Sequence, residues 1–238
     1  MNKKINFTAE MSIFEHLEEL RQRIFIAFLV FIIITVICFL YMKNISYILQ
    51  QPAIGIKFLQ LAPGEYLFTS IRVSLYSGFL FSSPFTIYQI TLFILPGLTE
   101  KESNFIIPIL FISIILFFCG IVFSYTILVP AALKFLINYG NDIVEPIWSF
   151  EQYFNFILLL LLSTGIAFQI PVIQIILGTL KIFSSADMYA YWRYIILGST
   201  VIAAIITPST DPITQIIMSI AIITLYSSGI IVLKLLNK

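Results

Sequence analysis

The chain has 238 residues, of which 60% are hydrophobic and only 11% are charged, and its mean hydropathy is +1.02. Soluble domains carry roughly 25% charged residues because their surface must be wetted, so this composition excludes an ordinary water-soluble fold. A net charge of +1 provides no electrostatic field for gathering nucleic acid, which excludes a nucleic-acid-binding protein. The solvent of this chain is therefore the lipid bilayer.

Six stretches without charged residues are long enough to be considered as membrane spans. An α-helix needs about 20 apolar residues to cross about 30 Å of hydrocarbon, where no water can satisfy an open backbone. The stretches predict an all-α, polytopic membrane protein in which residues 1–238 form one domain. The six predicted transmembrane helices cover about residues 24–42, 73–95, 105–129, 153–180, 194–207 and 213–233.

The last two spans are separate because Pro208, Asp211 and Pro212 interrupt what would otherwise be a helix of about 60 Å. Before this interruption the fifth span offers only about 20 Å of helix, which is short for a segment that faces lipid alone. Either neighbouring helices shield it or the bilayer thins around it.

Lysine and arginine are distributed unequally between the two ends of the predicted spans. One end carries nine of them, Lys3, Lys4, Arg21, Arg23, Lys101, Lys181, Arg193, Lys234 and Lys238. The other end carries four, Lys43, Lys57, Arg72 and Lys134. Positive flanks stay on the side where the chain is made, so both termini are predicted to lie on the cytoplasmic or stromal side, called the inside below. The N-terminus shows no cleavable signal or transit peptide, so an organelle protein of this kind is expected to be encoded in the organelle.

The segment Ser12 to Ile24 predicts an amphipathic helix just before the first span, because its apolar residues recur on one face at helical spacing. On the polar face Glu19 and Arg23 stand four residues apart, the spacing of an ion pair within a helix. This face is either a solvated surface with weak ion pairs or a recognition surface. His16 has no second ligand near it, and Cys38 and Cys119 lie inside apolar runs. No metal site, disulfide or cofactor is expected.

The inside loop after the second span carries Glu100 and Glu102 at a surface where cations are the rule. The two carboxylates either cap the third helix or form a docking point for a basic ligand, since carboxylates bind guanidinium groups through paired hydrogen bonds.

Gln169 lies near the middle of the fourth predicted span, in the sequence F-Q-I-P-V. A buried amide needs partners, so it bridges helices or contacts a substrate. Asp211 is expected to cap the sixth helix. The sequence contains no H-E-x-x-H, no spaced intramembrane histidines and no glycine-rich phosphate loop, so an enzyme is not expected and energy must come from an ion gradient or a partner.

The sequence H-L-E-E-L-R-Q-R, from His16 to Arg23, resembles the N-terminal signature of the TatC family, the multispanning core of the twin-arginine protein translocase. L-P-G-L-T-E-K-E, F-S-Y with the later Val-Pro, F-Q-I-P-V and T-P-S-T-D-P-I-T-Q follow in the family's order. The stretch from Gly55 to Tyr66 is most similar to the cyanobacterial and plastid branch.

The resemblance implies a receptor that binds the paired arginines of a signal peptide. It places the two signal-binding carboxylates at Glu19 and Glu102 and leaves Glu100 unaligned. The further residues that it implies for signal binding are Arg21, Phe93 and Leu98. The residues that it implies for structure or interfaces are Arg23, Pro52, Tyr125, Pro130 and Asp211. Gln169 stands where many bacterial members have a glutamate, which puts a proton-carrying role for the fourth span in doubt.

The resemblance also implies single-span TatA-like and TatB-like partners, twin-arginine signal peptides of folded cargo, a homo-oligomer within a larger complex and use of the proton motive force. A plastid thylakoid membrane is the expected location, and a bacterial plasma membrane or mitochondrial inner membrane is the alternative. Two other functions stay open on the residues alone. A six-span secondary transporter or channel should have ionisable groups at the midplane, where only neutral Gln169 lies, and a membrane assembly scaffold needs no surface carboxylates.

Overall fold

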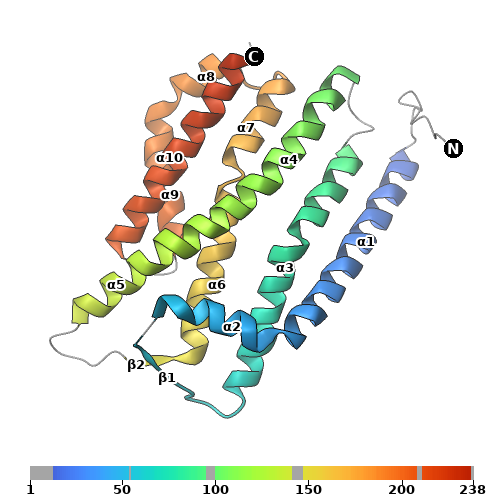
Figure 1. Ribbon diagram of the computed structural model, residues 1–238. Coiled ribbons are helices and arrows are strands. Elements are labelled where there is room, and N and C mark those ends of the chain that lie inside the picture. The colour runs from blue at the N-terminus through green and yellow to red at the C-terminus, as the bar shows by residue number, and fades with distance from the viewer. Residues whose placement is uncertain (1–12, 54, 95–99, 141–146, 208–210, 237–238) are drawn as a thin grey trace.

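The computed structural model describes residues 13–53, 55–94, 100–140, 147–207 and 211–236, which form a bundle of helices (Figure 1). The helices are α1 (Ile13–Leu40), α2 (Met42–Gln50), α3 (Glu65–Ile94), α4 (Glu100–Phe123), α5 (Val129–Gly140), α6 (Phe150–Ala167), α7 (Ile170–Thr179), α8 (Ser185–Ala190), α9 (Trp192–Ile206) and α10 (Pro212–Leu235). A π-helical turn, Ser124–Leu128, joins α4 to α5. The strands are β1 (Lys57–Leu59) and β2 (Ile147–Ser149).

Five helical segments are long and apolar enough to cross a membrane, namely 14–40, 65–94, 107–139, 150–179 and 212–235. Helix α9 is a shorter apolar helix between the last two of them. The predicted bundle of six apolar helical segments is confirmed. Helix α1 begins and α10 ends at the same end of the bundle (Figure 1).

Several boundaries differ from the predicted ones. The helical segment that contains the third predicted span continues to residue 139 rather than ending near residue 129. The amphipathic segment is not a separate helix, because α1 continues from Ile13 through the first span without a break. Helix α3 begins at Glu65 rather than near Val73. Arg72 ended the charge-free stretch, but its guanidinium donates to the Glu151 carboxylate at 3.0 Å and to the Asn155 side chain, so the charge is paired. The fourth span is divided between α6 and α7 by Phe168 and Gln169.

A small cap covers the end of the bundle opposite α8 (Figure 1). Strands β1 and β2 pair in parallel there, with Lys57 opposite Ile147. The Glu65 carboxylate accepts hydrogen bonds from the Ala62 amide at 3.1 Å, the Ser149 hydroxyl at 2.9 Å and the Glu151 amide at 3.0 Å. These bonds fix the start of α3 to the start of α6. Two strands of three residues within an otherwise helical chain leave too little pattern for a prediction from sequence.

Helix α2 is attached to the same end of the bundle by two tyrosines. The Tyr125 hydroxyl donates to the Ile48 carbonyl at 2.7 Å, and the Tyr153 hydroxyl donates to the Leu49 carbonyl at 2.8 Å. These carbonyls lie in the last turn of α2, where a helix has no intrahelical donors for its own oxygens. Half-buried Pro52 follows in a short 3₁₀ turn. Pro130 lies just after the π-helical turn, where the hydrogen-bond ladder already changes its pattern.

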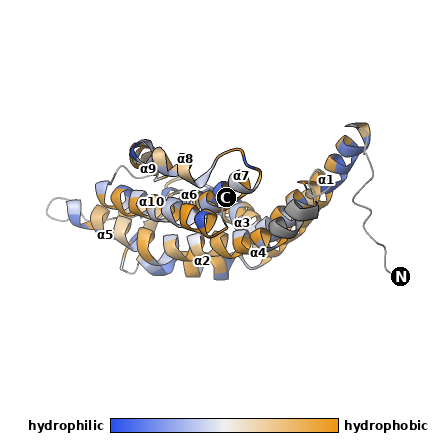
Figure 2. Cartoon of the chain, turned by 90° about the horizontal axis from the view of Figure 1, so that it is seen from above, coloured by the Kyte–Doolittle hydropathy of each residue, from blue (hydrophilic) through white to orange (hydrophobic). Residues whose placement is uncertain are grey.

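The packed core is centred on α6, whereas α1 lies at one edge of the bundle (Figures 1 and 2). Phe154, Ile157 and Leu158 of α6 are almost fully buried. Half of the most apolar stretch of 150–179 is buried in the protein, compared with 6% for 14–40. Helix α1 thus packs mainly on α3, and most of its surface faces outward.

We predict that Gly78 controls the contact between α1 and α3. A Cβ atom at this position would lie 2.9 Å from the Thr35 Cα and in collision with the Thr35 hydroxyl. Gly78→Ala should therefore lower the unfolding free energy by about 1–3 kcal/mol, measured as thermal unfolding in detergent. Gly198→Ala in α9 is the control, because nothing lies within 4 Å of its added Cβ. Equal loss of stability in both variants would contradict the predicted close contact.

We also predict that the end bearing α8 lies inside. Gln60 and Ile182 are exposed at opposite ends of the bundle. In a chain carrying Cys38→Ala and Cys119→Ala, Gln60→Cys should react with an impermeant thiol reagent only from the outside, and Ile182→Cys only from the inside. Labelling of both from one side would refute the predicted topology.

Candidate functional site

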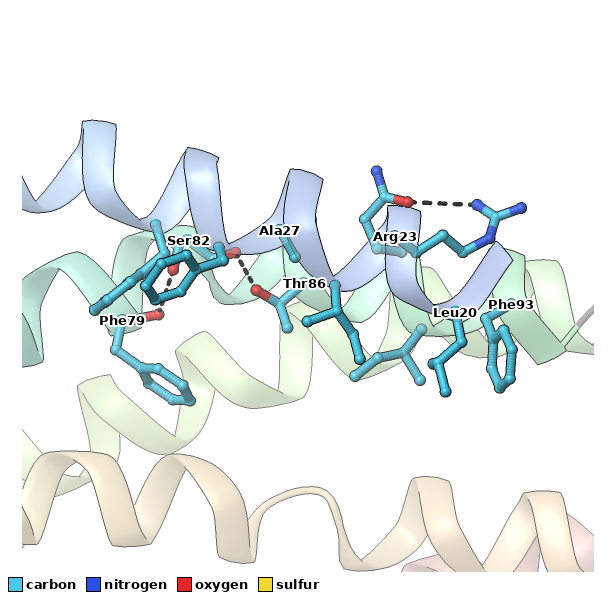
Figure 3. A pocket seen from close by; sticks show the side chains of 12 residues that line it. Leu20, Arg23, Ala27, Phe79, Ser82, Thr86 and Phe93 are labelled. Atoms are coloured by element: carbon cyan, nitrogen blue, oxygen red, sulfur yellow. Dashed lines mark hydrogen bonds between the residues drawn. The ribbon is translucent and has the colours of Figure 1, made fainter. Parts of the chain in front are cut away.

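Glu19 and Arg23 lie one turn apart on α1 and form an ion pair. The Arg23 Nε donates to Glu19 Oε1 at 2.9 Å, and the Arg23 Nη2 donates to the same oxygen. The third nitrogen, Nη1, donates to Gln89 Oε1 on α3 at 3.4 Å (Figure 3). The guanidinium is thus held between two helices.

The Glu19 carboxylate retains free acceptor capacity. Its side chain is 19% exposed, and the second oxygen, Oε2, is buried with no hydrogen-bond partner among the described residues. The His16 Nδ1 is 3.8 Å from this oxygen, which is too long for a hydrogen bond. An ionised carboxylate offers about four acceptor positions, so the bonds from Arg23 do not exhaust the acceptor capacity of Glu19.

His16 and Phe93 attach the start of α1 to the end of α3. Their rings stack with centroids 4.2 Å apart and an interplanar angle of 14°. Residues 16, 19 and 23 lie on one face of α1, and residues 89 and 93 lie one turn apart on α3. Gln89 was not anticipated from the sequence. Its spacing of four residues from Phe93 is the signal that could have indicated it.

A groove of about 420 Å³ runs between α1 and α3 from this ion pair toward the middle of the bundle (Figure 3). Leu20, Arg23, Gln89 and Phe93 line its polar end, and Phe31 and Phe79 line its far end. Ser82 and Thr86 also line it, but their hydroxyls donate to carbonyls of α3 itself. The groove is therefore charged at one end and apolar along its length.

The structure does not bring the other residues expected in the binding site together with Glu19, or does not describe their side chains. Arg21 is 76% exposed and pairs with Glu18, so it is not brought together with Glu19. Leu98 lies outside the described residues. Glu102 belongs to the first turn of α4, at the same end as the start of α1, but its side chain lies outside the described part of the structure (Figure 1).

Gln169 bridges the break between α6 and α7 to α4. Its Oε1 accepts from the Ser113 hydroxyl, and its Nε2 donates to the Ser113 carbonyl at 3.1 Å. Near this crossing α4 and α6 approach closely, since a Cβ on Gly120 would lie 3.1 Å from the Gly165 Cα. Both ends of the amide are thus engaged with one residue of a neighbouring helix.

Asp211 forms the N-cap of α10. Its Oδ2 accepts from the Thr214 amide at 2.8 Å, and the residue is buried. Among the described residues no group of three histidine, cysteine or acidic side chains is placed to hold a metal ion.

Apolar helical segments of membrane-crossing length, with ionic groups concentrated near their ends, define a multi-pass membrane protein. The profile of the family "Sec-independent protein translocase protein (TatC)" matches residues 15–220. The chain belongs to the TatC family and is a subunit of a Sec-independent protein translocase, a transport component and not an enzyme.

Similar proteins occur in red algae, cyanobacteria and plants. The tatC-like protein ycf43 of Gracilaria tenuistipitata var. liui is 87% identical over the whole of both chains. The "Sec-independent protein translocase protein TatC" of a Synechocystis strain is 51% identical, covering 96% of this chain and 90% of the relative. The chloroplastic TATC protein of Oryza sativa subsp. japonica is 49% identical, covering 96% of this chain and 64% of the relative.

The fold is also that of a solved relative. The crystal structure of "Twin Arginine Translocase Receptor- TatC in DDM" superposes with a TM-score of 0.81 at 36% identity, covering 92% of this chain and 99% of the other.

We predict that Gln169 stabilises the bundle and assembly and does not carry protons, because an amide does not titrate. Gln169→Leu removes both bonds to Ser113 and should cost about 1–3 kcal/mol of unfolding free energy, measured in detergent. Ser113→Ala removes only the hydroxyl bond and should cost less. Assembly or late transport should suffer more than initial binding of a twin-arginine peptide. Equal loss of initial peptide binding in Gln169→Leu and Glu102→Ala would contradict this order.

Proposed function

We propose that this chain is the receptor and core subunit of a twin-arginine translocase, which binds twin-arginine signal peptides and helps to move folded proteins across the membrane. One observation carries the proposal. The Glu19 carboxylate already binds the guanidinium of Arg23, which lines the polar end of an apolar groove, and its second oxygen has no hydrogen-bond partner among the described residues. A carboxylate that binds one arginine side chain has the chemistry to bind another from a ligand.

The shape of the groove fits the order of groups in a signal peptide. Such peptides have a positively charged region followed by an apolar stretch of about 7–15 residues. Between Phe93 and Phe79 the groove follows α3 for about 21 Å. The arginines would lie at Glu19, Phe93 would border them, and the apolar stretch would follow the groove between α1 and α3.

Glu102 is the proposed second carboxylate, and Leu98 a neighbouring contact, on the strength of the resemblance to the family. The turn of α4 that bears Glu102 lies at the same end of the bundle as Glu19. Arg21 is proposed only as an outer contact, since its guanidinium pairs with Glu18 on the exposed face of α1.

The remaining features of the proposal concern the translocase as a whole. Single-span TatA-like and TatB-like subunits are the proposed partners, with several copies of this chain in one complex. The proton motive force is the proposed energy source, since the sequence has no glycine-rich phosphate loop. A plastid thylakoid membrane is the proposed location, because a chloroplastic protein and a cyanobacterial one are among the relatives. A transporter or channel is less well supported, since Gln169, the midplane candidate, does not titrate and binds Ser113 through both its oxygen and its nitrogen.

We predict that the two carboxylates jointly hold the arginine pair. Hydrogen bonds to charged groups are worth about 1.5–3 kcal/mol, so Glu19→Ala or Glu102→Ala should weaken binding of a twin-arginine peptide roughly tenfold to a hundredfold. A twin-lysine peptide should bind more weakly than charge alone suggests, because an ammonium cannot form the planar pair of bonds.

The binding experiment titrates both peptides against the purified wild-type protein and its variants. Glu18→Ala is the matched control, because Glu18 lies next to Glu19 but pairs with Arg21 on the exposed face. Its affinity should stay within about twofold of wild type. The receptor proposal loses its residue-level basis if Glu19→Ala and Glu102→Ala both keep the wild-type preference for arginine.

A further inference from the structure

We propose that Arg23 is a resident competitor at the signal-binding site: it occupies Glu19 in the free protein, and a ligand arginine must displace it. This inference rests on the proposed function, since it assigns a role to a residue beside the same carboxylate. It concerns how tightly the site holds its ligand and how readily it releases it.

The Glu19–Arg23 pair differs from an ordinary pair on a helix surface. Two guanidinium nitrogens of Arg23 donate to Glu19, and the third donates to buried Gln89 on α3. The side chains are 22% and 19% exposed, whereas those of the neighbouring Arg21–Glu18 pair are 76% and 47% exposed. The resident guanidinium is therefore positioned by a second helix.

The surroundings of Glu19 make an exchange with Arg23 necessary for a ligand to bind. Both bonds from Arg23 to Glu19 go to Oε1, and Oε2 is buried with no hydrogen-bond partner among the described residues, the His16 Nδ1 lying 3.8 Å away. Because Arg23 holds Oε1 and Oε2 is buried, an incoming cation, whether guanidinium or ammonium, reaches the carboxylate only when Arg23 moves away from it. Gln89 Oε1, which accepts from Arg23 Nη1 at 3.4 Å, is the nearby acceptor that the displaced side chain would use.

A resident competitor lowers the apparent affinity by the same factor for every ligand that displaces it. The factor depends only on how strongly Arg23 binds in the free protein. Removing Arg23 should therefore tighten the binding of twin-arginine and twin-lysine peptides equally and leave the ratio of their affinities unchanged. A residue that contacts the peptide directly would change this ratio.

The test compares the peptide affinities of Arg23→Gln, Arg23→Lys and Lys181→Gln with that of the wild-type protein. Helix ion pairs of this spacing are modest, so Arg23→Gln should tighten both peptides about two- to fivefold. Arg23→Lys keeps the charge but loses the Nε bond, so it should give a smaller increase of the same sign. Lys181→Gln, in the exposed segment between α7 and α8, measures the effect of losing one positive charge from the same end of the bundle without changing a residue of the proposed binding site. Repeating the titrations at high salt removes most of that general charge effect.

Two results would overturn the competitor role. One is that Arg23→Gln binds no more tightly than Lys181→Gln at high salt. The other is that both Arg23 variants fail to fold, which would make Arg23 a structural link between α1 and α3. Combining Arg23→Gln with Glu19→Gln separates this inference from the receptor proposal. In the Glu19→Gln background the gain from Arg23→Gln should vanish. If Glu19→Gln leaves peptide binding unchanged in both backgrounds, the binding site itself is wrong. If it weakens binding but Arg23→Gln never tightens it, only the competitor role is wrong.

Discussion

The absence of water from the hydrocarbon layer is the constraint on which this structure depends. Every polar group placed there needs a partner within the protein. Hydroxyls such as those of Ser82, Thr86 and Thr164 donate to carbonyls of their own helices. The break between α6 and α7 is held by the Gln169 amide, which engages Ser113 at both ends. Among the described side chains with a buried atom that lacks a hydrogen-bond partner, Glu19 is the one that can carry a charge, which supports the proposed ligand site.

The same constraint divides the bundle into a rigid part and a less constrained edge. Glu65 joins the starts of α3 and α6, and α6 is packed on most sides. Helix α1 has no comparable cap in the described structure and packs chiefly on α3. The candidate binding groove lies at this edge, between one well-anchored helix and one helix with few neighbours. A site that must accept and later release a long peptide is served by such an arrangement, because only one contact has to adjust.

The sequence allowed the spans, the Glu19–Arg23 spacing and the Asp211 cap to be anticipated, since each depends on residues that are close together in the chain. Contacts between residues that are far apart in the sequence could not be anticipated in this way. Arg72 was placed outside the second span because it is charged. Its partners Glu151 and Asn155 lie far along the sequence, so the pairing that allows it within α3 was not foreseen. The contact of Arg23 with Gln89 and the pairing of β1 with β2 were missed for the same reason, because each joins residues that are far apart in the sequence. A composition window also treats an apolar segment as one helix, so it did not detect the break at Gln169.

Affinity and release place opposite demands on a receptor that passes its ligand onward. Two carboxylates that each form charge-assisted bonds worth about 1.5–3 kcal/mol would retain an arginine pair strongly. A guanidinium from the receptor itself offsets part of this energy, because it regains Glu19 whenever the ligand leaves. The selectivity for arginine would remain with the planar geometry of the carboxylates, and the residence time would be set separately by Arg23. One turn of α1 would thus supply both the group that recognises the ligand and the group that limits how tightly it is held.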